Sequence, residues 1–135
     1  MKNIKSVEFH NLAVADRRKI LSMVSGSEKN SFVSDAGNVS VQADSVDNIL
    51  QGRAVDFVKM DIEGSEFDAI VGMRNTLQKY KPTLAISVYH LVDDLFRLEL
   101  MIERYCKNQY NYYLRHYSPT VIETVLYAVP KCAEI

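Results

Sequence analysis

Asp61 and Glu63 are the residues whose position most strongly suggests chemistry. They stand in the stretch KMDIEGSEF (59–67), directly after the mostly apolar run VDFVKM (55–60), and a Gly-Ser pair follows them. A run that is apolar on both faces favours a central strand of a covered parallel sheet. Because open parallel sheets bind ligands at the carboxyl ends of their strands, the two carboxylates lie where a site is expected.

Tyr89 and His90 end the next predicted strand, TLAISVYH (83–90). If the two strands are neighbours, these side chains converge with Asp61 and Glu63 above one edge of the sheet. A carboxylate beside an imidazole can help it take a proton from a hydroxyl, because the carboxylate orients the ring and stabilises its charged form. The same groups can instead hold a divalent metal ion, since carboxylates suit Mg²⁺ or Mn²⁺ and the imidazole widens the choice. Both interpretations stay open.

Other polar residues have simpler explanations. Glu66 and Asp68 are expected to be charges at a helix N-terminus, where each stabilises the helix by ~0.3–1 kcal/mol. His10 is expected on the surface or on an edge strand. His116 lies in an alternating, tyrosine-rich run, where cross-strand packing accounts for it.

The elements that must position these residues alternate along the chain. Apolar or alternating runs predict strands over 6–14, 39–44, 55–60 and 83–90, short strands at 20–24 and 31–33 in a serine-rich stretch, and a hairpin of 110–117 with 121–129. Parallel strands 55–60 and 83–89, joined by a right-handed helical crossover, indicate an α/β fold. The hairpin adds an antiparallel strand to the same sheet.

Helical spacing predicts three helices. The first occupies 45–50 and begins at Ser45. The second begins at Ser65, which forms an approximate capping box with Asp68, and continues as one helix to Lys81-Pro82. The third is capped by Asp93 or Asp94, and its apolar positions Leu95, Leu98, Ile102 and Tyr105 keep helical spacing.

Composition sets the broad class. The chain has 135 residues, which suits one domain with a sizeable core. Its formal net charge of -1, with scattered Lys and Arg, gives no reason to expect nucleic acid or a membrane as partner. The N-terminus lacks the apolar core of a signal peptide, and the two cysteines fit no metal or redox spacing. A cytoplasmic setting is therefore expected.

The segment VDFVKMDIEGSEFDAIVGM resembles the signature of FkbM-type S-adenosylmethionine-dependent methyltransferases. The matching positions are Lys59, Asp61, Glu63, Gly64, Glu66, Ile70 and Gly72. The flanks are similar as well: NLAVAD, VQADSVDNIL with Asp47, KPTLAISVYHLVDDL and the closing hairpin resemble successive parts of the same domain. The resemblance covers nearly the whole chain.

This resemblance implies a Rossmann-like methyltransferase sheet, mostly parallel, with a C-terminal antiparallel hairpin. It implies S-adenosylmethionine as cofactor and a hydroxyl of a sugar or another small natural-product scaffold as acceptor. By position, Asp16 approaches the adenine and Asp61 lies closest to the methyl donor. Glu63 and His90 then handle the acceptor hydroxyl together with Asp61, as base, orienting group or metal ligand.

The sequence departs from the family pattern at its start. The family's glycine-rich cofactor turn is absent, because the five glycines are never two residues apart, and no strand-turn-helix precedes residue 6. Residues 1–135 are therefore expected to form a single partial domain that lacks the first two strands. Strand 55–60 would then have an open edge, which predicts either a truncated piece or pairing with another copy.

Three functions follow. The first is an O-methyltransferase, inactive if this chain acts alone without the cofactor turn. The second is a non-catalytic oligomeric assembly module with a degenerate methyltransferase fold. The third is a carboxylate-based hydrolase that uses Asp61 and Glu63 as a pair. The chain is too short for a barrel, which counts against the third.

Overall fold

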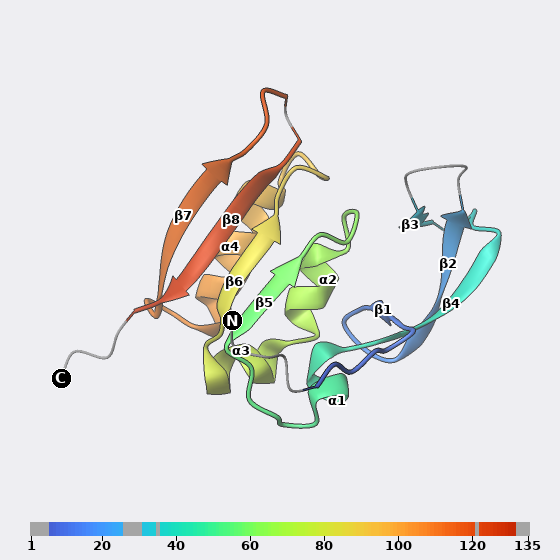
Figure 1. Ribbon diagram of the computed structural model, residues 1–135, viewed down its shortest axis with the longest axis horizontal. Coiled ribbons are helices and arrows are strands. Elements are labelled where there is room, and N and C mark those ends of the chain that lie inside the picture. Colours follow the sequence, from blue (N-terminus) through green and yellow to red (C-terminus); the bar gives the residue numbers. More distant parts are fainter. Residues whose placement is uncertain (1–5, 26–30, 35, 121, 132–135) are drawn as a thin grey trace.

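The computed structural model describes residues 6–25, 31–34, 36–120 and 122–131. In chain order the elements are β1 (Ala13–Val14), β2 (Lys19–Ser25), β3 (Ser31–Val33), β4 (Val39–Asp44), α1 (Val46–Leu50), β5 (Phe57–Met60), α2 (Glu66–Val71), α3 (Arg74–Tyr80), β6 (Thr83–Ser87), α4 (Asp94–Tyr105), β7 (Tyr110–His116) and β8 (Thr124–Pro130). They form two four-stranded sheets, in the orders β1-β4-β2-β3 and β5-β6-β8-β7. Helices α2, α3 and α4 cover one face of the second sheet (Figure 1).

The second sheet confirms the predicted α/β class. The mostly parallel arrangement that the sequence predicted is wrong for the described strands, because four of their six pairings are antiparallel and the strands divide into two sheets. β5 pairs with β6 in parallel, and β8 pairs antiparallel with both β6 and β7. Side chains alternate across the strands, so Leu84 and Ile86 of β6 are fully buried under the helices. There they join Ile70, Leu77, Leu98 and Ile102 in one hydrophobic cluster. Full burial of each such side chain is worth roughly 1.5–3 kcal/mol.

The first sheet confirms one prediction and corrects another. The strands expected at 20–24 and 31–33 are present as β2 and β3. The strand expected over 6–14 is wrong except for Ala13–Val14, which pair with β4 at only two positions. Upstream, Phe9 is 90% exposed, so its alternating apolar pattern has no second layer to be buried against.

The second helix is not continuous as predicted. It stops at Gly72 and restarts as α3, and the Ser65 side chain makes no capping hydrogen bond. Gly72 lies so close to the carbonyl oxygen of Ala15 that a Cβ atom would overlap it. Contact with the first sheet therefore bends the chain away from the path that its helical periodicity predicts.

Asp47 of α1 supplies the cap that α3 lacks. Its Oδ2 accepts a hydrogen bond from the backbone N–H of Asn75 at 2.9 Å. Its Oδ1 accepts from the backbone N–H and the hydroxyl of Thr76, at 2.9 and 2.7 Å. A carboxylate on the first N–H groups of a helix satisfies donors that have no partner within the helix. These bonds join the first sheet to the helical layer.

Strand β5 lies at the edge of its sheet, as expected for a chain that lacks the family's first two strands, although its apolar sequence alone favours a central position. Among the described strands its only partner is β6, and Phe57 is 54% exposed. An apolar strand with an unpaired edge is open to pairing with a further strand.

Of the helices that the structure describes, none has the length and apolar character needed to cross a bilayer.

Asp44 should make part of the stability depend on pH. It is buried, and hydrogen bonds from Asn48, with Arg18 and the Ser45 N–H also contributing, hold the pKa of its carboxyl below the ordinary value of 3.8. A lowered pKa stabilises the fold above about pH 4, and this contribution is lost as pH falls through the folded-state pKa. We expect the difference in unfolding free energy between wild type and Asp44→Asn, from urea titrations, to shrink below pH 4. Asn48→Ala should remove only part of the effect, and parallel pH profiles for all three proteins would contradict it.

Candidate active site

The loops after β5 and β6 bring Asp61, Glu63 and His90 together, as their positions at the strand ends predict. Asp61 Oδ1 lies 3.4 Å from His90 Nε2, and Glu63 Oε2 lies 3.6 Å from the same nitrogen. The imidazole is almost enclosed, with 8% of its side chain exposed, while both carboxylates are partly open to solvent. Nε2 has no hydrogen-bond partner within the described residues.

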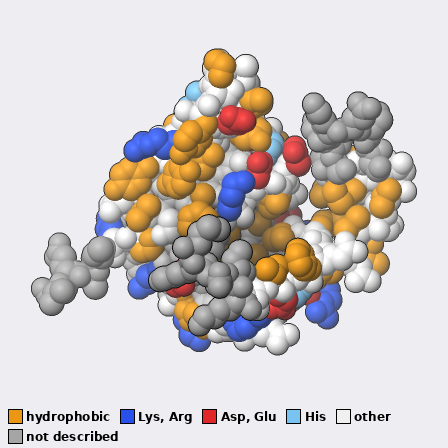
Figure 2. All heavy atoms as spheres, viewed as in Figure 1, with side chains coloured by type: hydrophobic (Ala, Val, Ile, Leu, Met, Phe, Trp, Pro, Cys, Tyr) orange, Lys and Arg blue, Asp and Glu red, His pale blue; other side chains and the backbone are white. Residues whose placement is uncertain are grey.

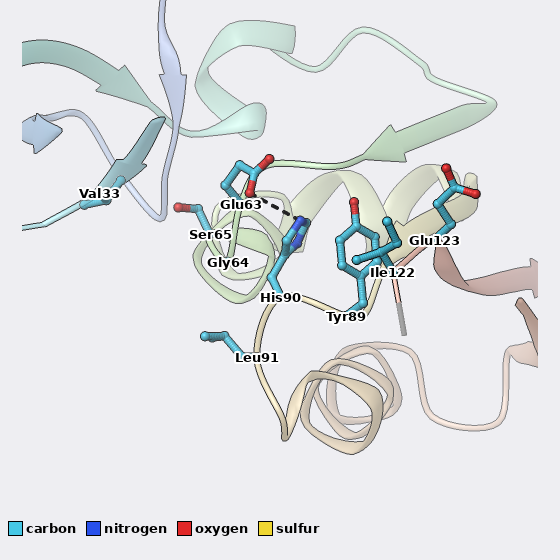
Figure 3. Close-up of a pocket in the computed structure, with 9 residues that line it drawn as sticks. All are labelled: Val33, Glu63, Gly64, Ser65, Tyr89, His90, Leu91, Ile122 and Glu123. Atoms are coloured by element: carbon cyan, nitrogen blue, oxygen red, sulfur yellow. Dashed lines mark ion pairs between the residues drawn. The ribbon is translucent and has the colours of Figure 1, made fainter. Parts of the chain in front are cut away.

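The loop after β5 is turned by two successive residues with positive φ. Glu63 has φ 55° and Gly64 has φ 92°. Glycine adopts this conformation without penalty, whereas a residue with a side chain is held there at a cost of about 1–3 kcal/mol, mostly at functional sites. The turn directs the Glu63 side chain towards His90 (Figure 3).

Glu66 is the site residue whose position sequence reasoning missed. It lies in the first turn of α2 as expected, yet it is fully buried beneath His90. Its Oε1 accepts a hydrogen bond from the backbone N–H of Ile62 at 2.9 Å and lies 3.0 Å from His90 Nδ1. Its Oε2 has no partner among the described residues. The match of Glu66 to the family signature was the signal that marked it out.

Tyr89 orders the open side of the cluster. Its hydroxyl donates a hydrogen bond to Asp61 Oδ1 at 3.1 Å, and its ring lies 4.2 Å from the His90 ring, centre to centre. Burial, followed by the bond to Asp61, raises the pKa of Tyr89 above 10.0. The phenol therefore stays protonated at neutral pH and acts as a donor.

The cluster opens into a pocket of about 710 Å³. Its wall comes from the loops after β5 and β6, from β3 and from the β7–β8 hairpin: Val33, Glu63, Gly64, Ser65, Tyr89, His90, Leu91, Ile122 and Glu123 (Figure 3). Acidic side chains gather over these loops with a histidine beside them (Figure 2). A smaller pocket of about 230 Å³, lined mostly by apolar residues of β1, β2 and β3, shares Val33, Glu63 and Ser65 with the first.

Asp16, expected near the adenine of a cofactor, lines neither of these two pockets. Its carboxylate pairs with Lys19 Nζ at 2.6 Å and with Arg17 at 3.5 Å. The bond from Lys19 is the main cause of the lowered pKa of Asp16. The cofactor-binding role of Asp16 stays a prediction. The other two histidines lie apart from the site, His10 beside Glu8 and His116 beside Thr124.

Fold and site together define an α/β protein with a carboxylate–imidazole centre at the carboxyl ends of two parallel strands. Residues 2–112 match the methyltransferase FkbM domain. The chain belongs to the FkbM methyltransferase family.

A solved structure supports this assignment. The crystal structure of methyltransferase FkbM from Methylobacillus flagellatus KT superposes with a TM-score of 0.70 at 31% sequence identity. The similarity covers 88% of this chain and 27% of that one, so the present chain spans about a quarter of the larger protein. No curated protein gives a significant match.

Proposed function

We propose that the chain is the acceptor-handling part of an S-adenosylmethionine-dependent O-methyltransferase, cytoplasmic, that acts on a hydroxyl of a sugar or another small natural-product scaffold. The observation that carries the proposal is His90 Nε2, which has no hydrogen-bond partner among the described residues and lies near two carboxylates in the wall of a pocket. A nitrogen so placed can accept the proton that a hydroxyl loses when it is methylated. Membership in a methyltransferase family supports this reading over a carboxylate-based hydrolase.

The residues at the site fit the proposed cofactor. When bound, S-adenosylmethionine supplies a methyl group on a cationic sulfonium, already activated for transfer. Glu63 and Glu123 give the large pocket negative charge, which favours a cation. The adjoining pocket, with Leu12, Val14 and Met23 in its wall, offers an apolar surface for a flat ring.

The protein's own residues then position the acceptor and move one proton. Glu66 accepts the Nδ1–H of His90, which leaves the lone pair of Nε2 on the side of Asp61 and Glu63. With the cofactor bound, the acceptor hydroxyl would give its proton to Nε2 as its oxygen bonds to the methyl carbon and the bond from that carbon to sulfur breaks, which leaves S-adenosylhomocysteine. The imidazolium that forms is stabilised by Asp61 and Glu63.

Calorimetric titration of the 135-residue chain with S-adenosylhomocysteine tests the proposal. We expect saturable binding of one molecule per chain, weakened in Asp61→Asn, with adenosine alone binding less tightly.

Sedimentation of the same samples tests self-association, which we propose occurs through the open edge of β5. Absence of binding in a stable oligomer would favour the assembly module, and a monomer with an intact sheet would contradict the edge pairing.

A further inference from the structure

We propose that Asp61, Glu63 and His90 Nε2 form a site for one divalent metal ion, with Glu66 as the residue that positions the imidazole. The role of the ion in methylation rests on the proposed function, whereas the binding of the ion does not. With an ion bound, the lone pair of Nε2 would coordinate it and no longer act as the base. A hydroxyl bound to a divalent ion loses its proton more readily, so the ion would then prepare the acceptor oxygen for methylation. Binding of the ion itself follows from the geometry of the four side chains.

The His90 ring is oriented as a metal ligand would be. A histidine that binds a metal usually donates its other ring N–H to a carboxylate, which fixes the tautomer. Glu66 Oε1, 3.0 Å from Nδ1, is placed for that bond. Glu66 is fully buried and also accepts a hydrogen bond from the Ile62 N–H, so its carboxylate is fixed and keeps the ring in place. The lone pair of Nε2 is then directed at Asp61 and Glu63.

The distances from His90 Nε2 to the two carboxylates are those expected for ligands of one ion. In tetrahedral sites, N and O ligands at about 2.0–2.2 Å from the ion lie roughly 3.3–3.6 Å from one another. The distances from Nε2 to Asp61 Oδ1 and Glu63 Oε2 are 3.4 and 3.6 Å, too long for hydrogen bonds and right for two ligands of one ion. The group whose ligand atoms all lie within 4.8 Å of one another is Asp61, Glu66 and His90, and Glu63 lies outside it. The exposed Glu63 side chain would therefore have to shift to join Asp61 on the same ion.

The negative charge around His90 lacks a compensating cation among the described residues. Three carboxylates surround one imidazole, and no described Lys or Arg forms an ion pair with any of the three. Glu66 Oε2 is buried without a hydrogen-bond partner among the described residues. Burial of a charged group is costly unless another charge compensates it. A dication beside Nε2 would neutralise most of this excess.

The ligand set indicates the kind of ion. One imidazole with carboxylates suits Mn²⁺ or Zn²⁺ better than Ca²⁺, which prefers a shell of oxygens alone. Asp61 and Glu63 are partly exposed, so the ion keeps open positions for water or for the acceptor hydroxyl. This arrangement matches a catalytic site rather than a closed structural one.

Electron paramagnetic resonance of Mn²⁺ titrated into the 135-residue chain, with no other ligand present, tests the site. We expect loss of the free-ion signal until one Mn²⁺ is bound per chain. Glu66→Gln keeps an acceptor oxygen for the histidine but removes the charge, and should weaken binding about 10–100-fold. Asp61→Asn should weaken it at least as much. Asp68→Asn, which removes one charge from the exposed side of the same helix, should bind like wild type.

A second readout uses wild-type protein and so does not depend on the variants folding. Mn²⁺ should broaden the imidazole proton resonances of His90 at lower concentrations than those of His10 and His116. Equal broadening of all three, or equal weakening by Asp68→Asn and Glu66→Gln, would overturn the site in favour of diffuse attraction. Mn²⁺ binding without S-adenosylhomocysteine binding would retain the site and remove the proposed function.

Discussion

His90→Ala is expected to lower the rate of methyl transfer by about 10²–10⁴-fold, the range typical of the loss of a positioned acid–base group. His90 Nε2 is the nitrogen that the two carboxylates flank, and no other imidazole lies in this pocket. The single lone pair of Nε2 can act as the base or bind the proposed metal ion, and alanine removes either role. The measurement, made on a complete domain that supplies the cofactor turn, is the initial rate of S-adenosylhomocysteine formation with a panel of sugar and small-molecule hydroxyl acceptors.

The matched control for this variant is His116→Ala. His116 lies on β7 and its Nδ1 is 2.8 Å from the hydroxyl of Thr124, so its removal perturbs the surface and not the cluster. It should retain the wild-type rate. Wild-type turnover by His90→Ala would remove this residue from the mechanism, whereas a fall in both variants would point to a general loss of structure.

Gly72→Ala is expected to reduce the free energy of unfolding by about 3 kcal/mol, at the upper end of the range for overpacking. The added Cβ would overlap the carbonyl oxygen of Ala15 and lie 3.1 Å from the Cβ of Ser45. Ala15 and Ser45 directly follow β1 and β4 of the first sheet, so the change forces the ends of these strands away from the helical layer. The hydrogen bond from the Asp47 N–H to the Gly72 carbonyl, 3.0 Å long, would be strained as well.

Gly52→Ala is the control for backbone effects alone. Gly52 has φ 80°, and a Cβ there would meet nothing within 4 Å. It should cost only the penalty of a left-handed residue, about 1–2 kcal/mol. Urea titrations of both variants measure the two costs. If Gly72→Ala loses no more stability than Gly52→Ala, the contact with Ala15 does not hold the sheet against the helices.

The convergence of Asp61, Glu63 and His90 was predictable from the sequence. Two apolar runs joined by a helix predict adjacent parallel strands, and parallel strands end at the same edge. The burial of Glu66 was not predictable in this way. Its place in the first turn of a helix predicts an exposed charge, and only the packing of α2 against the loop after β6 buries it under His90.

By itself the sequence determined the elements whose periodicity is local: the β5–β6 pair, the C-terminal hairpin, α4 and the family signature. The tertiary structure alone decided where the second helix breaks, because the cause is a contact between Gly72 and Ala15, far apart along the chain. It likewise decided that β1 has only two residues. Side-chain periodicity records which face of an element is apolar, whereas partners distant in sequence determine whether that face or edge is covered.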